Sequence, residues 1–246
     1  MNDPFKIMPH DTAVVYKFLQ NNPLLSPFIL IGGTGLALHI GHRQSEDLDF
    51  ITLQKRLPKA ALMKIQEDLK AAGHTIVQKV DAGADEDFET AGMDASDYTQ
   101  TLLIDGKTKL TFFTADTHHA NLLKDTGNNT NDGFRIGTFT ELCQLKAAVA
   151  ASRSKSRDWI DLFLLERDHQ FGLKQWKEAY DKAGYTDTHL EQAFNRICSG
   201  KVREDDEGFL TLMPDPPSVE EIAQRFRDLR KDYEVTLARN VLKKGE

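Results

Sequence analysis

Hydrophobic and polar residues recur along the chain with two different periods, which predict strands and helices in mixed order. The wholly apolar run Phe28–Ile31 predicts a buried strand, and Asp47–Ile51 alternates polar and apolar residues as a half-buried strand does. Between these two segments, the apolar residues of 36–40 have the spacing of a short helix, which the polar segment 41–46 ends. This part of the chain therefore predicts a strand, a helix and a second strand.

The same two periods continue through the rest of the sequence. Asp105-Gly106 separates two alternating segments and predicts a β-hairpin. The acidic segment Asp81–Asp97 and the polar segment Asp125–Gly133 predict exposed loops. Further strands are expected at His74–Val80, Tyr98–Ile104, Lys107–Thr114 and Phe134–Ile136, and further helices at Thr12–Asn21, Leu57–Ala72, Leu173–Ala183, Thr188–Cys198 and Ser218–Lys244.

The segment Thr140–Glu166 has the longest helical pattern in the middle of the chain. It predicts one amphipathic helix capped by Thr140, or two helices if Ser152–Ser156 interrupts it. Helices alone are expected after this segment. We therefore expect an α/β (α+β) protein, with a small mixed β-sheet in a first domain of residues 1–139 and a helical C-terminal domain of residues 140–246.

Asp47 and Asp49 are the first candidates for chemistry. In a strand they point to the same face, roughly 7 Å apart, while Leu48 and Phe50 face the core. Two carboxylates at that distance repel each other unless a cation binds between them, and Mg2+ prefers oxygen ligands. An isolated Asp-x-Asp is more often a solvated strand face, so the metal site depends on what surrounds the pair.

Gly32 and Gly33 stand where the first strand gives way to the helix. Glycine allows a tight turn and the close approach of a ligand, and a helix N-terminus offers N–H groups and a positive dipole to phosphate. The hydroxyl of Thr34 adds a hydrogen-bond donor. The glycines alone predict no more than a turn, but beside the two carboxylates they predict a phosphate-binding site next to a metal site.

The ordered combination resembles a known signature. Gly33-Thr34, followed after twelve residues by Asp47-x-Asp49, is similar to the motif of the DNA polymerase β-like nucleotidyltransferase superfamily. The longer segment GGTGLALHIGHRQSEDLDFIT resembles the AbiEii-type nucleotidyltransferase toxins of bacterial toxin–antitoxin systems. The residues that carry this narrower match are His42, Arg43, Ser45, Asp47, Asp49 and Phe50. The resemblance implies metal ligation by Asp47 and Asp49, and nucleotide binding by Gly32, Gly33, Thr34, Arg43 and Ser45.

The segment Thr140–Glu166 extends the resemblance to a second AbiEii-type signature. The matching residues are Leu145, Lys146, Val149, Arg153, Arg157, Asp158, Trp159, Asp161 and Leu162. The resemblance implies that Lys146 binds the triphosphate and that Asp158 or Asp161 is an active-site carboxylate. Arg153 would bind the phosphates or hold an acid in place. Without the resemblance, Lys and Arg beside an apolar stripe indicate a helix with a solvated edge.

One feature of the wider superfamily is missing. Many of its members carry a third metal-binding carboxylate on a later strand, but Lys109–Thr114 has none, and Asp116 just beyond it is the nearest candidate. The resemblance implies Mg2+ as the cofactor and an NTP as the substrate, with a two-ion site and Mn2+ in place of Mg2+ as open alternatives.

Charge and hydropathy narrow the possible partners. A net charge of −7 argues against general affinity for nucleic acid, but it leaves room for a local basic groove. No apolar run reaches membrane-spanning length and the N-terminal segment lacks a signal-peptide pattern, so we expect a cytoplasmic protein with no membrane partner. The C-terminal helix predicts either a solvated face or an RNA-binding surface, from Arg225, Arg227, Arg230, Lys231, Arg239, Lys243 and Lys244.

The resemblance therefore implies a Mg2+-dependent enzyme that transfers a nucleoside monophosphate from an NTP to an acceptor, and the phosphate-binding and metal-binding residues agree with it. The resemblance implies a growth-inhibiting toxin neutralised by a separate antitoxin, with RNA as the acceptor and the tRNA 3′ end as the first choice. A protein hydroxyl is the alternative acceptor. A catalytically inactive module that binds nucleotide or antitoxin is the alternative from another class, but the intact Asp47, Asp49 and Lys146 argue against it.

Overall fold

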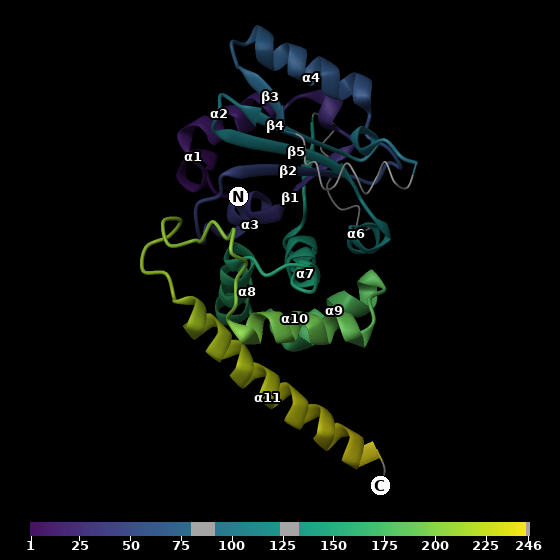
Figure 1. Ribbon diagram of the computed structural model, residues 1–246, viewed down its shortest axis with the longest axis vertical. Helices are drawn as coiled ribbons and strands as arrows, with labels where there is room; N and C mark the ends of the chain where they lie inside the picture. Colours follow the sequence, from purple (N-terminus) through teal and green to yellow (C-terminus); the bar gives the residue numbers. More distant parts are fainter. Residues whose placement is uncertain (80–91, 124–132, 245–246) are drawn as a thin grey trace. The chain divides into compact units, whose positions relative to one another are not determined.

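A computed structural model of the protein describes residues 1–79, 92–123 and 133–244 (Figure 1). Most of the predicted loop Asp81–Asp97 and nearly all of the predicted loop Asp125–Gly133 lie outside the described residues. The chain forms two compact units, Met1–Phe139 and Thr140–Glu246. The first unit mixes strands and helices and the second is helical, so the α/β class predicted from the sequence is confirmed.

The N-terminal unit is built on a mixed sheet whose described strands follow the order β3-β4-β5-β2-β1-β6. These strands are β1 (Phe28–Ile31), β2 (Asp47–Thr52), β3 (Ile76–Lys79), β4 (Thr99–Ile104), β5 (Thr108–Thr114) and β6 (Arg135–Ile136). β2 pairs in parallel with β5, and β1 pairs in parallel with β6, whereas the other neighbours are antiparallel. The strand that carries both aspartates therefore lies inside the sheet, with β5 on one side and β1 on the other.

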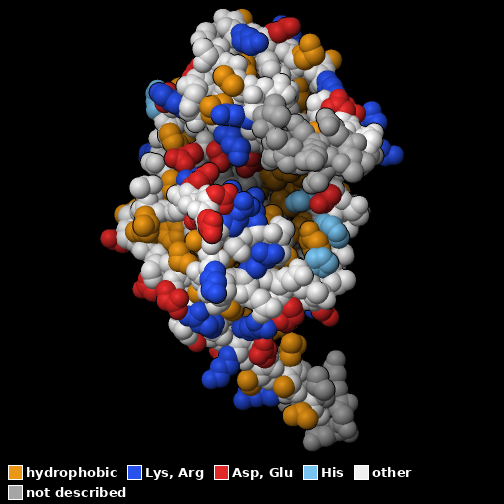
Figure 2. Space-filling model, in the orientation of Figure 1, with side chains coloured by type: hydrophobic (Ala, Val, Ile, Leu, Met, Phe, Trp, Pro, Cys, Tyr) orange, Lys and Arg blue, Asp and Glu red, His pale blue; other side chains and the backbone are white. Residues whose placement is uncertain are grey.

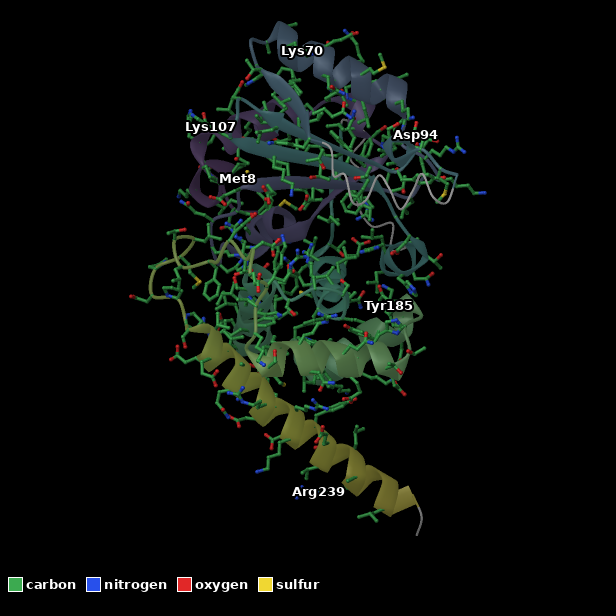
Figure 3. The ribbon with its side chains drawn as sticks, in the orientation of Figure 1. Met8, Lys70, Asp94, Lys107, Tyr185 and Arg239 are labelled. Carbon is green, nitrogen blue, oxygen red and sulfur yellow. The ribbon has the colours of Figure 1, made fainter. Side chains whose placement is uncertain are left out.

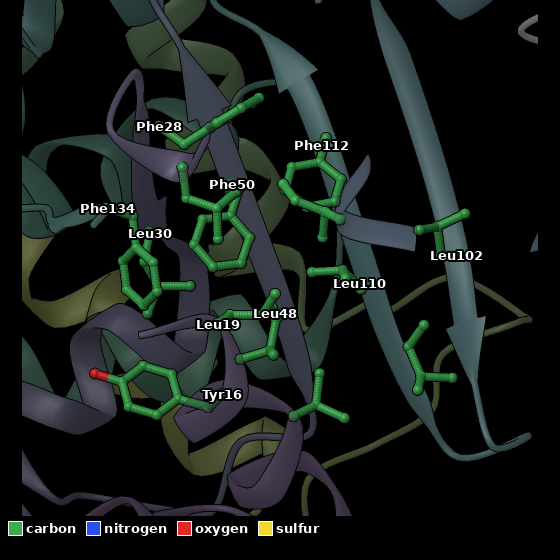
Figure 4. Close-up of a cluster of buried hydrophobic side chains, with 14 of the residues drawn as sticks. Tyr16, Leu19, Phe28, Leu30, Leu48, Phe50, Leu102, Leu110, Phe112 and Phe134 are labelled. Atoms are coloured by element: carbon green, nitrogen blue, oxygen red, sulfur yellow. The ribbon is translucent and has the colours of Figure 1, made fainter. Parts of the chain in front are cut away.

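One face of this sheet forms the hydrophobic core (Figure 4). Leu48 and Phe50 are fully buried in it, as the alternation in β2 predicts. The ring of Phe50 stacks on Phe112 with centroids 5.4 Å apart and meets Phe134 edge-on at 4.8 Å. Burying a side chain of this size contributes about 2 kcal/mol to the folding free energy. The apolar residues of β2 therefore determine which face of the strand packs on the core. The aspartates of β2 consequently lie on the opposite face.

The hairpin between β4 and β5 turns at Asp105-Gly106, as predicted. Both residues have positive φ, 53° and 69°, and this is the backbone geometry of the tightest hairpin loops. The Asp105 carboxylate also accepts hydrogen bonds from the backbone N–H of Thr75, at 2.7 Å, and from its hydroxyl, at 3.1 Å. The turn fixes the register of the hairpin, which places Thr101 opposite Thr111.

The described helices of this unit lie at its start and between its strands. The first two helices, α1 and α2, pack on each other, and α2 also packs on β2 and β5. These helices are α1 (Pro4–Ile7), α2 (His10–Leu19), α3 (Gly32–Ile40), α4 (Lys59–Ala71) and α6 (Thr117–Leu122).

The C-terminal unit consists of the helices α7 (Phe139–Val149), α8 (Ser156–His169), α9 (Leu173–Ala183), α10 (Asp187–Ser199) and α11 (Val219–Lys244). The predicted segment Thr140–Glu166 is two helices, broken between Val149 and Ser156. The predicted cap at Thr140 is wrong, because α7 begins one residue earlier, at Phe139. The ring of Phe139 lies 6.2 Å from that of His39, a contact that favours the earlier start.

The last helix, α11, differs between its two halves. It starts with the predicted capping box, in which the Glu221 backbone N–H donates to Ser218 Oγ and the Ser218 N–H donates to the Glu221 carboxylate. Its first half buries Ile222, Ala223 and Phe226, while hydrophobic side chains of its second half are exposed (Figure 2). In the parts of the chain that the structure describes, no helix is long and apolar enough to span a membrane.

Candidate active site

The junction between β1 and α3 brings the first glycine against an aspartate. α3 begins at Gly32, directly after β1, and Gly32 has a φ of +71°, in the left-handed region. A Cβ at Gly32 would lie 2.7 Å from Oδ2 of Asp49, closer than non-bonded atoms approach. The carboxylate of Asp49 therefore lies over Gly32, and the predicted phosphate-binding turn and metal-binding strand are neighbours.

The first turn of α3 has the properties of an anion site. The residue before it, Ile31, offers no side-chain cap to the N–H groups of this turn. A helix of nine residues also carries partial positive charge at its N-terminus, where phosphate groups bind in many proteins. The turn can therefore hold a phosphate beside Asp49.

The second glycine packs against two of the residues that match the first signature. A Cβ at Gly33 would lie 2.5 Å from Nη2 of Arg43 and 3.1 Å from Oγ of Ser45. Arg43 is only 6% exposed, and its Nη1 donates to the backbone carbonyl of Gln44 at 2.8 Å. Gly33, Arg43 and Ser45 thus form one packed group. A side chain at position 33 would clash with the guanidinium of Arg43 in its present position.

The hydroxyl of Thr34 makes contacts within the protein. Thr34 is buried, and its Oγ1 is hydrogen-bonded to the backbone carbonyl of Asp47 and lies 2.8 Å from Oγ of Ser45. These contacts fasten the start of β2 to α3. The side chain predicted as a donor to the nucleotide therefore has a structural contact that holds Asp47 in place.

Asp47 and Asp49 lie half-buried on the face of β2 opposite the core. The described residues include no group of three or more His, Cys, Asp or Glu side chains able to hold a metal. Two carboxylates fit a hard divalent ion whose remaining ligands are phosphate oxygens and water, which is how Mg2+ is bound with nucleotides. The donor set therefore fits a substrate-bridged ion better than a closed structural site.

The neighbouring strand supplies two residues that sequence reasoning missed. In the parallel ladder, Lys109 of β5 pairs with Asp47, and Thr111 pairs with Asp49. Paired residues point to the same face, so an ammonium and a hydroxyl stand beside the two carboxylates. Alternation along β5 was visible in the sequence, but the identity of its partner strand was not, because sheet pairing joins distant segments.

Asp116, the nearest candidate for a third carboxylate, caps a helix instead. Its Oδ1 accepts a hydrogen bond from the backbone N–H of His119 at 2.7 Å and lies 2.8 Å from Nδ1 of the same residue. These hydrogen bonds lower the pKa of Asp116 to about 2. Thr114 is the last residue of β5 and pairs with Thr52, the last residue of β2. Asp116 comes after Thr114, so it lies past the end of the paired strands.

In the C-terminal unit, the predicted residues of α7 and α8 form one buried charge cluster. Nζ of Lys146 lies 2.7 Å from Oδ1 of Asp158 and 2.7 Å from Oδ2 of Asp161. Arg153 donates to Asp158 from Nε at 2.7 Å and from Nη2 at 3.1 Å. Lys146 and Asp158 are 7% and 2% exposed, and Asp161 is fully buried. The formal charges of the four residues sum to zero, and Arg153 reaches Asp158 from the break between α7 and α8.

The charge cluster controls the ionisation of Asp158. Burial raises the pKa of this carboxyl, but the ammonium of Lys146 and the guanidinium of Arg153 outweigh burial and hold the pKa below its ordinary value. Asp158 is therefore a carboxylate at neutral pH, as a ligand or base must be.

Arg157, a matching residue of the second signature, lies in a different network. Its Nε donates to the backbone carbonyl of Gly208 at 2.9 Å, and its Nη1 lies 3.1 Å from the carboxylate of Glu207. Asp206 accepts hydrogen bonds from both the backbone N–H and the hydroxyl of Ser156, at the first residue of α8. The connection between α10 and α11 thus holds the start of α8 in place. The sequence around Asp206 gives no local sign of this role.

The arginines at the start of α11 are paired with acidic residues. Arg225 donates to Glu166 at 2.7 and 3.0 Å, and Arg227 pairs with Glu220. Arg230 contacts Glu191 at 2.6 Å and Glu234 at 2.8 Å. Figure 2 shows basic and acidic side chains interspersed on this unit. These three arginines favour the prediction of a solvated, ion-paired face over that of an RNA-binding surface.

Comparison with known proteins identifies the family. The model of the family described as nucleotidyl transferase AbiEii toxin, type IV TA system, matches residues 14–240. The chain belongs to the AbiEii toxin family. This AbiEii protein is therefore a nucleotidyltransferase and a toxin of a toxin–antitoxin system. Its family uses an NTP and a divalent metal, and family membership implies an antitoxin as partner.

Three relatives of this AbiEii protein have 16–25% sequence identity to it. The uncharacterized protein aq_aa25 of Aquifex aeolicus (strain VF5) is 25% identical over 210 residues, which are 85% of this chain and 89% of the relative. Among solved structures, JHP933 from Helicobacter pylori is 19% identical with a TM-score of 0.47, covering 96% of this chain and 99% of that one. MenT4, the nucleotidyltransferase toxin Rv2826c from Mycobacterium tuberculosis H37Rv, is 16% identical with a TM-score of 0.46, covering 88% of this chain and 82% of that one.

Proposed function

We propose that this AbiEii toxin uses Mg2+ to transfer a nucleoside monophosphate from an NTP to RNA, with the 3′ end of tRNA as the favoured acceptor. The observation that carries the proposal is the position of the Asp49 carboxylate, beside Asp47 on one strand and over Gly32 at the start of α3. A metal-binding carboxylate next to a phosphate-binding helix start suits a reaction at a phosphate group.

The protein groups of this site have separate tasks in the proposed reaction. Mg2+, when bound by Asp47 and Asp49, neutralises charge on the triphosphate and makes the α-phosphorus more electrophilic. The first turn of α3 binds the phosphates through its N–H groups. Thr34 and Ser45 hold the start of β2, and Arg43 packs on Gly33, so these residues keep the carboxylates and the helix start in register.

The transfer itself replaces one bond at phosphorus by another. The acceptor hydroxyl oxygen forms a bond to the α-phosphorus, the bond from this phosphorus to the bridging oxygen breaks, and pyrophosphate leaves. The hydroxyl proton passes to a carboxylate of the protein. Positioning and charge neutralisation supply most of the acceleration of such reactions, so few protein groups are needed.

We assign the charge cluster of Lys146, Arg153, Asp158 and Asp161 to the same reaction. Lys146 is proposed to stabilise the triphosphate and the departing pyrophosphate, and Asp158 or Asp161 to serve as an acid–base group. The contacts between Lys146 and both carboxylates support a second task, in which the lysine holds the two carboxylates in position.

The experiment that tests the proposal follows a radiolabel. Purified protein is incubated with each α-32P-labelled NTP, Mg2+, and total cellular RNA or protein, beside an Asp47→Asn/Asp49→Asn variant. A labelled tRNA band that the variant does not produce is the expected result. A labelled protein band would replace RNA by a protein hydroxyl as the acceptor. No label in either fraction, from folded wild-type protein, would contradict transferase activity and favour a nucleotide- or antitoxin-binding module.

A further inference from the structure

A polar surface extends sideways from the two aspartates across three more strands of the sheet. Register places residues of neighbouring strands in rows on one face. One row consists of Lys79 on β3, Thr101 on β4, Thr111 on β5 and Asp49 on β2. The next row consists of Val77 on β3, Leu103 on β4, Lys109 on β5 and Asp47 on β2. We call Lys79, Thr101, Lys109 and Thr111 the β3–β5 strip.

Two observations indicate that the strip faces a ligand. Lys79 and Lys109 are exposed, and neither ammonium has an ion-pair partner within residues 1–79, 92–123 and 133–244. By contrast, Lys107 in the same hairpin pairs with Asp11 at 2.9 Å. In addition, Oγ1 of Thr111 is shielded from solvent and has no hydrogen-bond partner among the described residues. A buried hydroxyl without a partner is costly, so an incoming ligand that supplies one is favoured.

The charge of the strip selects the kind of ligand. The chain as a whole carries a net charge of −7, yet the strip has two lysines and two hydroxyls and no acidic residue. Neighbouring strands are about 4.8 Å apart, so the row from Asp49 to Lys79 spans about 14 Å. A surface of this length with free ammonium and hydroxyl groups suits a few nucleotides of a single strand, whose phosphates carry the complementary charge.

The position of the strip separates it from the nucleotide site. The start of α3 follows β1, which pairs with β2 on one side, whereas the strip lies on β5, β4 and β3, on the other side of β2. We propose that the β3–β5 strip binds the acceptor, and that the acceptor is the single-stranded 3′ end of an RNA whose terminal hydroxyl reaches Asp47 and Asp49. This inference rests on the proposed function, because it assigns a surface to the acceptor of that reaction.

The test removes the two unpaired lysines. The variant Lys79→Gln/Lys109→Gln is compared with Lys70→Gln/Lys107→Gln, which removes two exposed lysines of the same unit that lie outside the strip (Figure 3). Total tRNA is the probe, and both transfer kinetics and tRNA binding at several salt concentrations are measured. We expect the strip variant to raise the KM for tRNA at least 10-fold and to leave the KM for the labelled NTP within twofold.

The salt dependence gives a second readout that a structural defect would not reproduce. Each phosphate contact to a single strand contributes about 0.7 to the slope of log K against log salt, so the strip variant should lower the slope by about 1.4. The control variant should keep the slope and both KM values of the wild type. A Thr111→Val variant, which removes the unpartnered hydroxyl, should raise the KM for tRNA without lowering the melting temperature.

Four results would overturn the assignment. If the wild-type protein is active and the strip variant has an unchanged KM for tRNA, the strip does not bind the acceptor. The proposed function would then remain intact. A rise in the KM for NTP alone would mean that the two lysines bind the NTP and not the tRNA. An equal loss of tRNA affinity in the strip and control variants would mean that the lysines attract tRNA only through general electrostatics. Wild-type protein that labels no tRNA would remove the RNA acceptor from the proposed function, and the strip proposal with it.

Discussion

The carboxylate of Asp49 lies so close to Gly32 that a single carbon added to Gly32 would stand 2.7 Å from Oδ2. Gly32 follows directly after β1, and the last residue of β1, Ile31, pairs with Asp49 of the antiparallel strand β2. The absence of a side chain at Gly32 is therefore what gives this carboxylate its position at the start of α3.

Replacing Gly32 by alanine should abolish transfer. The φ of +71° costs an alanine about 1–2 kcal/mol, and the new Cβ must also displace the Asp49 carboxylate. We expect at least a 100-fold loss in rate together with a modest loss of stability, measured by transfer of label and by urea unfolding. Gly73→Ala is the matched control, because Gly73 has a φ of +95° and open space around its Cβ position. If both variants lose activity equally, the contact with Asp49 is not the cause.

Replacing Asp49 by asparagine should separate activity from stability. The substitution keeps the size of the side chain and removes one of two like charges on the same strand face, so we expect a much smaller effect on the unfolding free energy than on transfer. Transfer should fall at least 100-fold, because the proposed metal site loses one of its two carboxylates. Thermal melting in EDTA and label transfer in Mg2+ measure the two effects. A variant that is destabilised and only slightly slower would assign Asp49 a structural role.

Replacing Asp158 by asparagine should destabilise the C-terminal unit. The change removes the contact of Asp158 with Arg153 and one of the two described aspartate contacts of Lys146, and breaking a buried pair in this way costs about 3 kcal/mol. Urea unfolding measures this loss. Asp205→Asn is the control, because the pair of Asp205 with Arg203 is exposed and its removal should leave stability unchanged. Equal effects of the two substitutions would show that burial of the cluster does not matter.

The low pKa of Asp158 predicts a particular dependence of stability on pH. Its pKa in the folded protein lies below the ordinary value of 3.8, so the unfolded chain binds the proton more readily. The stabilisation is fully present above that ordinary value and is lost as the pH falls through the folded pKa. The difference in unfolding free energy between wild type and Asp158→Asn should therefore be constant from pH 5 to 7 and shrink toward pH 3. A difference that grows on acidification would contradict this sign.

Replacing Arg230 by glutamine should affect the fold and not the acceptor. Arg230 contacts Glu191, Glu234 and Asn195, so its charge is already balanced within the C-terminal unit. We expect a lower melting temperature and a KM for tRNA within twofold of the wild-type value. A large rise in this KM, at unchanged stability, would restore α11 as an RNA-binding surface.

What the sequence by itself determined is local. Alternation in β2 placed Leu48 and Phe50 in the core and both aspartates on the other face, because side chains of a strand alternate whatever its neighbours are. The turn at Asp105-Gly106 and the capping box at Ser218 depend likewise on a few adjacent residues. The family signature could be read for the same reason, since its residues lie within two short segments.

Only the tertiary structure decided which groups surround those side chains. Lys109 and Thr111 stand beside the aspartates because β5 pairs with β2, and the hydroxyl of Thr34 holds Asp47 because α3 folds back on β2. Ion pairing of Arg225 with Glu166 joins residues 59 positions apart. Each of these contacts depends on segments that are distant in the chain, and local periodicity carries no information about the partner that a strand or a charge acquires when those segments pack.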